Sequence, residues 1–399
     1  MADEFARPIA AAWVSDGTTG ARNYDELSSY DEIADVIRAR PSSMLAVDMP
    51  HCAPADRAAG RSFFDALPDA PVRLQRLKDE GRFAHETDVV VPYRIASGDH
   101  ASYGVWLMVS TEEISTSADD PGRVIRNEDV FPEKVRERVA LTEALGHLVS
   151  AVLLVQTSGG DALTDALREW CDRHEPAGRD VDDHGQVHEV WVMGPSAERD
   201  RLLDIVNTSA MIVADGNHRS LAAQQAQLPA FLAVVTASES VVIRPYNRLL
   251  RDLGISVDEL LDRFAAAGCT VGQLDRPAAI PAAGGQVEVY AGGRSYAVRL
   301  PEAHGSVVDR MDHSVVERVL LADALGLAPD DERIAYIGGD YGPEWLRAEV
   351  DAGRAVAAVL IAPVSTDEFV RVNEERMRMP RKSTWFTPKA RAGLVLAEL

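Results

Sequence analysis

The sequence predicts a mixed α/β protein made of two regions. Short apolar runs bounded by turn-forming residues alternate with amphipathic stretches along the whole chain, as expected when strands and helices alternate. The 399 residues, 46% of them hydrophobic, exceed one ordinary domain and suffice for a core. We expect a division near residue 240, between a motif-bearing domain over 1–240 and a second α/β region over 241–399.

The elements of the first region follow from the spacing of its apolar residues. Strand-forming runs and alternating patterns predict strands, and apolar residues three or four positions apart predict helices. Residues 211–214 fit either a short strand or the last turn of a helix. Strands are expected at 43–47, 103–109, 152–156, 186–193 and 231–236, and helices at 66–81, 133–151, 162–174 and 220–227.

In the second region, glycines at turns and the alternation of apolar and polar residues predict the elements. Residues 287–290 and 295–300 predict a hairpin around Gly292 and Gly293, and Gly326 is placed to end a preceding helix. Helices are expected at 256–269, 314–325 and 366–375, and a βαβ-like unit at 334–337, from 342, and at 357–361.

The charge balance excludes some partners. Asp and Glu number 63 against 41 Lys and Arg, a formal net charge of −22. Such a surface repels nucleic acid and anionic lipid, although a local basic pocket can still hold a small anion. Since the chain also lacks a basic helix-turn-helix, we expect a small-molecule substrate and no nucleic-acid partner. The sequence does not define an oligomeric state.

The remaining composition indicates a cytoplasmic protein. Cys52, Cys171 and Cys269 are far apart in the sequence, which argues against a disulfide framework and against zinc held by thiolates. No apolar run approaches the length that spans a bilayer. The N-terminus lacks a basic stretch followed by an apolar one, so we expect no secretory leader and no membrane partner.

The first candidate site is the run Asp215-Gly216-Asn217-His218-Arg219. Gly216 permits a sharp turn, and N–H groups at the start of a following helix suit an anion. Arg219 can hold phosphate or carboxylate with two N–H groups. Asp215 could bind a metal ion or accept a proton, and His218 could donate to developing charge. The alternative is a plain connector, in which Asp215 caps the helix and Arg219 forms a salt bridge.

The second candidate site is Arg126-Asn127-Glu128, just before the helix predicted from residue 133. A carboxylate beside an arginine can act as a general base or a metal ligand. More often it caps a helix or belongs to a solvated charged face. Arg136 or Arg138, on the helix, could point back toward the same pocket.

The third candidate site is the C-terminal run from Pro380 to Lys389, in which the turn Lys382-Ser383-Thr384 could cradle a phosphate. Cationic, hydroxyl-rich turns bind phosphate, although this one lacks the glycines of a P-loop. The alternative is a structural clasp, with Trp385 and Phe386 packed in the core.

Taken together and in this order, these motifs resemble a bacterial family known as domain of unknown function 1015. The resemblance runs from end to end. It is carried by Asn23-Tyr24-Asp25, by Asn127-Glu128 with Arg138, by residues 214–219 (ADGNHR), and most specifically by residues 379–394, which match MPxKSTxFxPK followed by GL.

The ADGNHR element in turn resembles the phosphate-binding turn of the ParB/sulfiredoxin-like superfamily, which includes nucleotide-dependent free serine kinases. This resemblance implies such a fold for the motif-bearing half, with the tail of the second region returning to the site. It implies Glu128 as general base, and Asp215, His218 and Arg219 for phosphate and metal. Gly216, Asn217, Arg126, Arg138 and Lys382 to Thr384 would complete a nucleotide or phosphate site. The implied cofactors are Mg²⁺ and ATP, ADP or pyrophosphate.

Three positions depart from the family pattern. Asn127 and Asn217 replace histidines, and Ser220 replaces an aromatic residue. Asparagine forms hydrogen bonds but carries no proton or charge near neutral pH. The leading hypothesis is a phosphotransferase acting on a small, serine-like hydroxylated metabolite. A non-catalytic nucleotide- or metabolite-binding regulator and a phosphate-ester hydrolase are the alternatives, and a ParB-like DNA-associated protein is disfavoured by the charge.

Overall fold

The computed structural model describes residues 5–115 and 122–399 as a mixed α/β protein, which confirms the predicted fold class. Its residues group into two compact units. The first unit contains residues 1–126, 130–242 and 388–399, and the second contains residues 127–129 and 243–387. Residues 127–129, which include Glu128, therefore belong to the second unit although residues on both sides of them belong to the first. The C-terminal residues 388–399 return from the second unit to the first.

The first unit contains two sheets. The large one has the strand order β10-β11-β4-β5-β13-β9-β12-β7-β6, with β1 also paired to β5, and the small one has the order β3-β2-β22-β8. Its strands are β1 (Ala6–Arg7), β2 (Ile9–Ser15), β3 (Phe83–Val89), β4 (Val91–Ser97), β5 (His100–Ser110), β6 (Ile114–Ser115), β7 (Val124–Ile125), β8 (His147–Leu148), β9 (Val152–Gln156), β10 (Gly178–Val181), β11 (Val187–Val190), β12 (Met211–Asp215), β13 (Ala230–Ala237) and β22 (Val395–Glu398).

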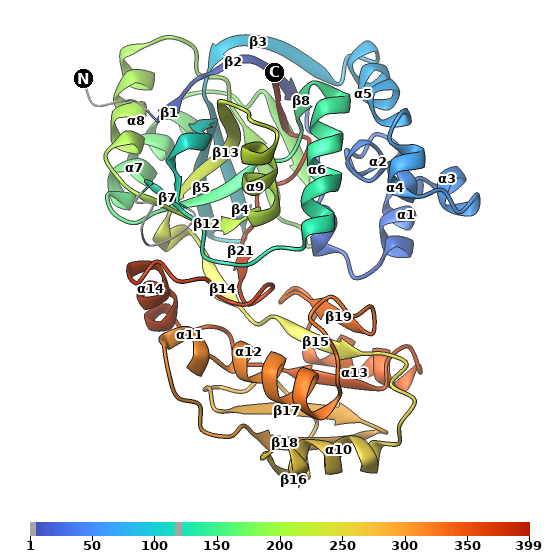
Figure 1. Cartoon of the computed structure of the whole chain (residues 1–399). Coiled ribbons are helices and arrows are strands. Elements are labelled where there is room, and N and C mark those ends of the chain that lie inside the picture. Colours follow the sequence, from blue (N-terminus) through green and yellow to red (C-terminus); the bar gives the residue numbers. More distant parts are fainter. Residues whose placement is uncertain (1–4, 116–121) are drawn as a thin grey trace. The chain divides into compact units, whose positions relative to one another are not determined.

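Helices pack against these sheets in the first unit (Figure 1). Leu163 and Leu167 of α7 and Leu202 of α8 join the core of the large sheet. Leu74 of α5 and Leu141 of α6 share a second core with the small sheet. The helices are α1 (Tyr30–Ala39), α2 (Leu45–Asp48), α3 (Pro54–Ala58), α4 (Phe63–Ala66), α5 (Asp69–Asp79), α6 (Pro132–Leu145), α7 (Gly160–Cys171), α8 (Ala197–Asn207) and α9 (Asn217–Gln225), and the 3-10 turns are η1 (Tyr24–Glu26), η2 (Pro50–Cys52), η3 (Thr111–Glu113) and η4 (Ser238–Ser240).

The second unit is built on a six-stranded sheet of order β16-β18-β17-β20-β15-β19. The predicted hairpin is confirmed as β17 and β18, and the βαβ-like unit as β19, α13 and β20, with β15 inserted between the two parallel strands. A separate two-stranded sheet joins β14 and β21. The elements are β14 (Val242–Arg244), β15 (Asn247–Leu250), β16 (Thr270–Leu274), β17 (Gln286–Ala291), β18 (Arg294–Arg299), β19 (Ile334–Ile337), β20 (Ala357–Leu360), β21 (Trp385–Thr387), α10 (Val257–Ala266), α11 (Val307–Arg310), α12 (Asp312–Val315), the π-helix η5 (Val316–Ala324), α13 (Pro343–Asp351) and α14 (Thr366–Glu374).

Two predicted elements of the first unit were wrong. The strand expected at 43–47 is replaced by the short helix α2, whose four residues are all buried, so its apolar run carries no periodicity that separates strand from helix. The helix expected to reach residue 151 ends at Leu145. Gly146 adopts a left-handed conformation there, with φ 60°, and its N–H bonds to the carbonyl of Thr142.

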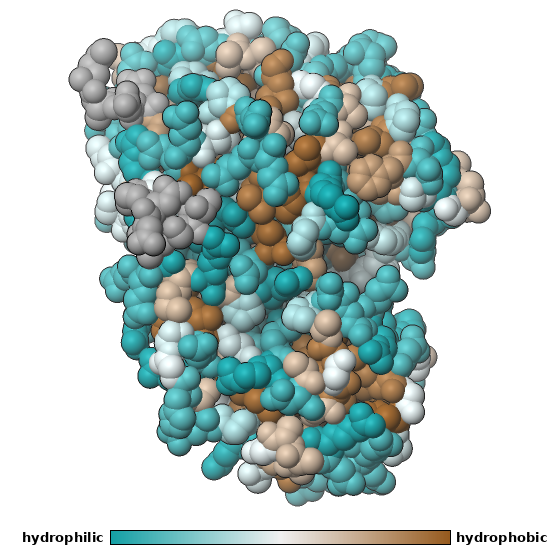
Figure 2. Space-filling view, viewed as in Figure 1, coloured by the Kyte–Doolittle hydropathy of each residue, from teal (hydrophilic) through white to brown (hydrophobic). Residues whose placement is uncertain are grey.

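The surface is largely hydrophilic on the face shown in Figure 2, with apolar residues in scattered patches. Among the described residues, no helix is long and apolar enough to cross a membrane.

Candidate functional site

The turn between β12 and α9 places the first candidate site. The residues before Asp215 are buried and extended, so the alternative of a helical turn is excluded. Gly216 has φ +93°, and a Cβ atom there would lie 2.9 Å from Nε of Arg219. A glycine is therefore required both for the left-handed conformation and for the close approach of Arg219. The helix starts at Asn217, three residues earlier than predicted.

Asp215 lies between two cations. Its Oδ2 pairs with Nη2 of Arg219, one helical turn away, and its Oδ1 pairs with Nζ of Lys389 from the C-terminal tail. Nη1 of Arg219 also donates to Oδ1 of Asn23 at 2.8 Å. The side chains of Asp215, Arg219 and Lys389 are all about one-tenth exposed, so these charges interact in a partly desolvated site.

Glu26 completes this group, which we call the Asp215 cluster: Asn23, Glu26, Asp215, Arg219 and Lys389. Oε1 of Glu26 accepts from the backbone N–H of Asn23 at 2.8 Å and from its Nδ2 at 2.6 Å. Burial raises the pKa of Glu26 to about 7, while the charge of Lys389 lowers it and that of Asp215 raises it. The cluster therefore contains a carboxylate that exchanges protons near neutral pH.

Arg219 and Arg138 line one cavity, whose empty space of about 400 Å³ includes open solvent. Arg138 donates from Nη1 to Oδ1 of Asp48 at 2.8 Å, and its guanidinium lies 4.6 Å from the centroid of the Tyr24 ring. Oγ of Ser150, also in the lining, is buried and has no hydrogen-bond partner among the described residues. The cavity thus brings together two of the predicted anion-binding arginines.

His218 and Asn217 occupy the first turn of α9 in different ways. Nε2 of His218 accepts the backbone N–H of Phe131 at 2.9 Å, and the two rings stack at 5.8 Å. This contact requires an unprotonated Nε2. Oδ1 of Asn217 is buried without a hydrogen-bond partner in the described part of the chain. The catalytic role of His218 remains a prediction.

In the second unit, the turn Lys382-Ser383-Thr384 surrounds Glu128. Oε1 of Glu128 accepts from the backbone N–H of Ser383 at 2.9 Å, from that of Thr384 at 3.0 Å, and from its hydroxyl at 3.1 Å. Lys382 has φ 57°, a left-handed conformation. The turn predicted to cradle phosphate thus converges on a carboxylate of the chain itself.

Burial raises the pKa of Glu128, although the N–H groups of this turn and the charge of Lys382 lower it. Asn127, its neighbour, is fully buried. Neither side-chain amide atom has a partner among residues 5–115 and 122–399, while its carbonyl accepts from Met379 N. Arg126 is also buried and is the last residue of the first segment of the first unit.

The predicted site residues therefore divide by unit. Asp215, Gly216, Asn217, His218, Arg219, Arg126 and Arg138 lie in the first unit, and Glu128, Lys382, Ser383 and Thr384 lie in the second. The prediction of site residues omitted Asn23, Glu26 and Lys389. Two signals were present in the sequence: Asn23 begins one matched motif, and Lys389 lies within the tail motif. Glu26 had no signal, because only tertiary burial distinguishes it from the other acids.

Comparison with known proteins identifies one family. Residues 18–315 match the family described as protein of unknown function (DUF1015). Among curated proteins, no sequence matches the chain.

Solved structures resemble the chain at low identity. A conserved hypothetical protein from Pyrococcus furiosus is 12% identical with a TM-score of 0.40, and the match covers 72% of this chain and 95% of that one. A mutant free serine kinase in complex with AMP is 12% identical with a TM-score of 0.41, over 72% and 92%. C-terminally truncated SbnI from Staphylococcus aureus is 11% identical with a TM-score of 0.40, over 72% and 84%.

Proposed function

This chain belongs to the DUF1015 family, and we propose that it is a phosphotransferase that acts on a small hydroxylated metabolite. The phosphoryl donor is a nucleotide or pyrophosphate, and the acceptor is serine-like. The observation that carries the proposal is the Asp215 cluster. There two cations from distant parts of the sequence meet at the start of α9 beside a buried carboxylate.

Phosphoryl transfer needs positioning, neutralisation of charge and a proton acceptor more than covalent chemistry by the protein. The N–H groups at the start of α9, together with Arg219 and Lys389, supply positive potential for phosphate oxygens. Arg138 adds a second guanidinium in the cavity that Arg219 lines. Both arginines are held by carboxylates, Asp215 and Asp48, which fix their orientation before a ligand arrives.

The reaction forms one bond and breaks another. The acceptor hydroxyl oxygen bonds to the terminal phosphorus, and the bond from that phosphorus to its bridging oxygen breaks, releasing the shortened nucleotide or phosphate. The hydroxyl proton passes to a carboxylate. We assign this role to Glu128, because it is the residue that the family resemblance implies and because burial raises its pKa, which makes the carboxylate a better proton acceptor.

A Mg²⁺ ion held by the protein alone does not fit the Asp215 cluster. Both oxygens of Asp215 are paired with cations. Within residues 5–115 and 122–399, no group of three or more His, Cys, Asp and Glu side chains is placed to hold a metal ion. We therefore propose that any divalent ion arrives with the phosphates of the donor, as is common for Mg²⁺.

The test is ³¹P NMR of the purified chain with Mg²⁺, one donor (ATP, ADP or pyrophosphate) and a pool of hydroxy-amino acids. We expect a new phosphomonoester signal. Glu128→Gln should reduce turnover about 10²- to 10⁴-fold, the usual contribution of a general base, with nucleotide affinity unchanged. Asp215→Asn should weaken donor binding by loosening Arg219 and Lys389. Glu133→Gln, an exposed acid in the first turn of α6, is the matched control and should retain full turnover.

Other outcomes identify other functions. Free phosphate without a phosphomonoester would indicate a hydrolase. Turnover that survives Glu128→Gln would show that Glu128 is not the general base. The same measurement would then be made on Glu26→Gln.

The second candidate function is a non-catalytic nucleotide- or metabolite-binding regulator, and one observation favours it. Asn127 and Asn217, which stand where the family pattern has histidine, are buried with amide atoms that lack partners in the described structure. Neither can carry a proton. If no donor changes while nucleotides still raise the melting temperature, the regulator is the better description.

A further inference from the structure

A second pocket in the first unit lies outside the Asp215 cluster. Its empty space amounts to about 470 Å³, part of which is open to solvent. Its polar lining consists of Arg22, Arg40, Ser43, Asp183 and Arg391, and we call it the arginine pocket. These residues come from the loop before α1, the end of α1, the turn before α2, the β10–β11 turn and the C-terminal tail.

Two of the arginines share one buried carboxylate. Arg40 Nη2 lies 2.7 Å from Oδ1 of Asp180, and Arg391 Nε lies 2.6 Å from its Oδ2. The side chain of Asp180 is only 1% exposed. Gly20 allows this arrangement, because a Cβ atom there would lie 2.5 Å from the Asp180 carboxylate. One carboxylate cannot neutralise two guanidinium groups, so this wall of the pocket carries net positive charge.

The N–H groups of this wall are only partly used. Arg391 Nη2 donates to the carbonyl of Gly20 at 3.2 Å, and its Nη1 makes no hydrogen bond to any described residue. The hydroxyl oxygen of Ser43 accepts from Leu45 N–H, and its own proton has no acceptor in the described part of the chain. A ligand carboxylate would find donors from a guanidinium and a hydroxyl on the same wall.

Negatively charged carboxylates lie at the rim of the arginine pocket. Arg22 Nη2 lies 3.2 Å from Oδ2 of Asp183 and 4.0 Å from Oε1 of Glu32. The side chain of Asp183 is 68% exposed, so its carboxylate can turn to a ligand cation at little cost. Three guanidinium groups face three carboxylates when Asp180 is included, and this balance favours a ligand that carries both charges.

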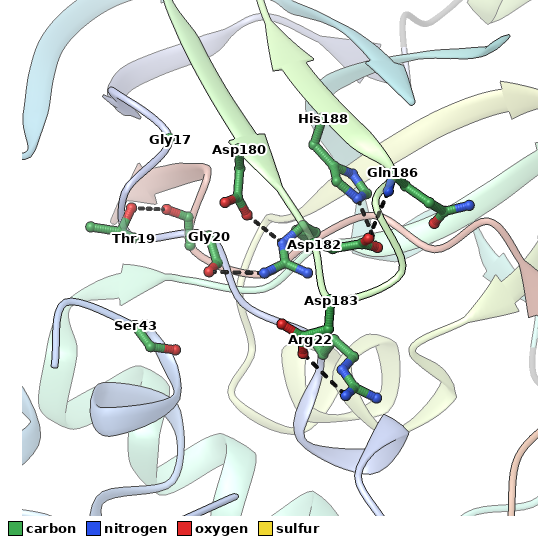
Figure 3. Close-up of polar contacts among 12 residues, drawn as sticks. Gly17, Thr19, Gly20, Arg22, Ser43, Asp180, Asp182, Asp183, Gln186 and His188 are labelled. Atoms are coloured by element: carbon green, nitrogen blue, oxygen red, sulfur yellow. Dashed lines mark hydrogen bonds and ion pairs between the residues drawn. The ribbon is translucent and has the colours of Figure 1, made fainter. Parts of the chain in front are cut away.

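Asp182 braces the turn that carries Asp183 through its contacts with Gln186 and His188 (Figure 3). Asp182 Oδ1 accepts the N–H groups of His184 and Gln186, at 2.9 and 2.8 Å, and its Oδ2 lies 3.3 Å from Nε2 of His188. Burial lowers the pKa of His188, so its neutral ring donates from Nε2 to Asp182.

The same chain of contacts reaches the tail. Nδ1 of His188 accepts from the Tyr93 hydroxyl at 2.6 Å, and that hydroxyl accepts the N–H of Arg391 at 3.3 Å. The turn that carries Asp183 is therefore linked to the backbone of Arg391 through the side chains of Asp182, His188 and Tyr93.

We propose that the arginine pocket binds a free aliphatic α-amino acid. The ligand carboxylate lies against Arg391, Arg40 and the Ser43 hydroxyl, and its ammonium group meets Asp183. Its side chain packs on the apolar lining formed by Leu27, Val36 and Leu45. This inference does not depend on the proposed function, because it concerns other residues and a binding event without chemistry.

The test is isothermal titration calorimetry of the full chain with L-leucine. The probes 4-methylpentanoate, isopentylamine and L-serine lack the ammonium, the carboxylate and the aliphatic side chain, respectively. We expect saturable binding of leucine at one site, with each of the other three roughly tenfold weaker or undetectable. Binding of 4-methylpentanoate or serine as tight as that of leucine would overturn the assignment of an aliphatic amino acid.

Variants then locate the binding. Ala39→Trp, at an exposed residue of the lining, fills the pocket without removing a charge and should abolish binding. Arg40→Gln should weaken it at least about tenfold. Arg38→Gln is the matched control, because Arg38 lies on the same helix with its side chain 63% exposed and pairs with Asp35. No saturable binding of any probe, or binding that survives both pocket variants, would contradict the proposal.

Discussion

Glu26 is a single carboxylate whose ionisation is coupled to folding. It is 6% exposed, and both of its hydrogen bonds from Asn23 reach one oxygen. Burial raises its pKa from 4.5 to about 7, so the folded state binds its proton more tightly than the unfolded state does. Between these two pH values the free energy of unfolding therefore falls as pH rises, and it levels off above about pH 7.

We expect Glu26→Gln to remove this pH dependence. Glutamine keeps an acceptor oxygen for Asn23 but carries no charge, so the variant should be more stable than the natural chain at pH 8, by up to roughly 3 kcal/mol. At pH 4.5 the two proteins should be nearly equal. The measurement is urea denaturation at half-unit steps from pH 4.5 to 8, with Glu133→Gln as the exposed control. A difference that is the same at every pH would show that Glu26 does not titrate in this range.

At the scale of elements, the strand–turn–helix of β12 and α9 depends on Gly216. Two requirements meet there: a left-handed backbone, and the absence of a side chain beside Arg219. Gly81 offers a comparison, because it has φ +72° and a Cβ atom there would have no neighbouring atom within 4 Å. Gly81 therefore also needs a left-handed backbone, but a side chain at position 81 would meet no neighbouring atom.

We expect Gly216→Ala to destabilise the chain by more than Gly81→Ala does. Backbone strain alone costs about 1 kcal/mol or somewhat more in each variant. The clash with Arg219 adds to this at position 216 and displaces the guanidinium from Asp215 and Asn23. Chemical denaturation gives the two free energies, and nucleotide binding should weaken in Gly216→Ala alone. Equal losses in the two variants would mean that the close approach of Arg219 has no energetic consequence.

At the scale of the whole molecule, the C-terminus is a structural part of the first unit. β22 pairs with both β2 and β8, so the last strand of the chain is an inner strand of the small sheet. Leu396 is fully buried in the core that also contains Leu74 and Leu141. The same tail carries Lys389 to Asp215 and Arg391 to Asp180. Both sites of the first unit therefore depend on the return of residues 388–399.

We expect Leu396→Ala to destabilise the first unit by about 2–5 kcal/mol, the usual cost of removing a buried leucine side chain. Leu399→Ala is the control, because Leu399 is 52% exposed and should change stability by no more than about 0.5 kcal/mol. Hydrogen exchange should quicken in β2 and β3 but not in β17 and β18, which belong to the second unit. Equally faster exchange in all four strands would show that the two units unfold together.

The sequence by itself determined the mixed α/β class, the hairpin of β17 and β18, and the family. These features rest on local signals: the period of apolar residues, glycines at turns, and short motifs. The strand prediction at 43–47 was wrong because it too relied on a local signal. All four residues of α2 are buried, so the apolar run has no period that separates strand from helix. The candidate turn at residues 215–219 was found because its five residue types are contiguous.

Only the tertiary structure decided which groups meet. Lys389 reaches Asp215 across 174 positions, and Glu128 meets Ser383 across 255. No local pattern encodes such pairs, since they depend on where strands and tails return. The raised pKa of Glu26 likewise comes from burial among distant residues, and the arginine pocket is assembled from segments between Gly20 and Arg391. The sequence shows which residue types are available for a reaction or for binding. Only the packing of the chain determines which of them lie close together.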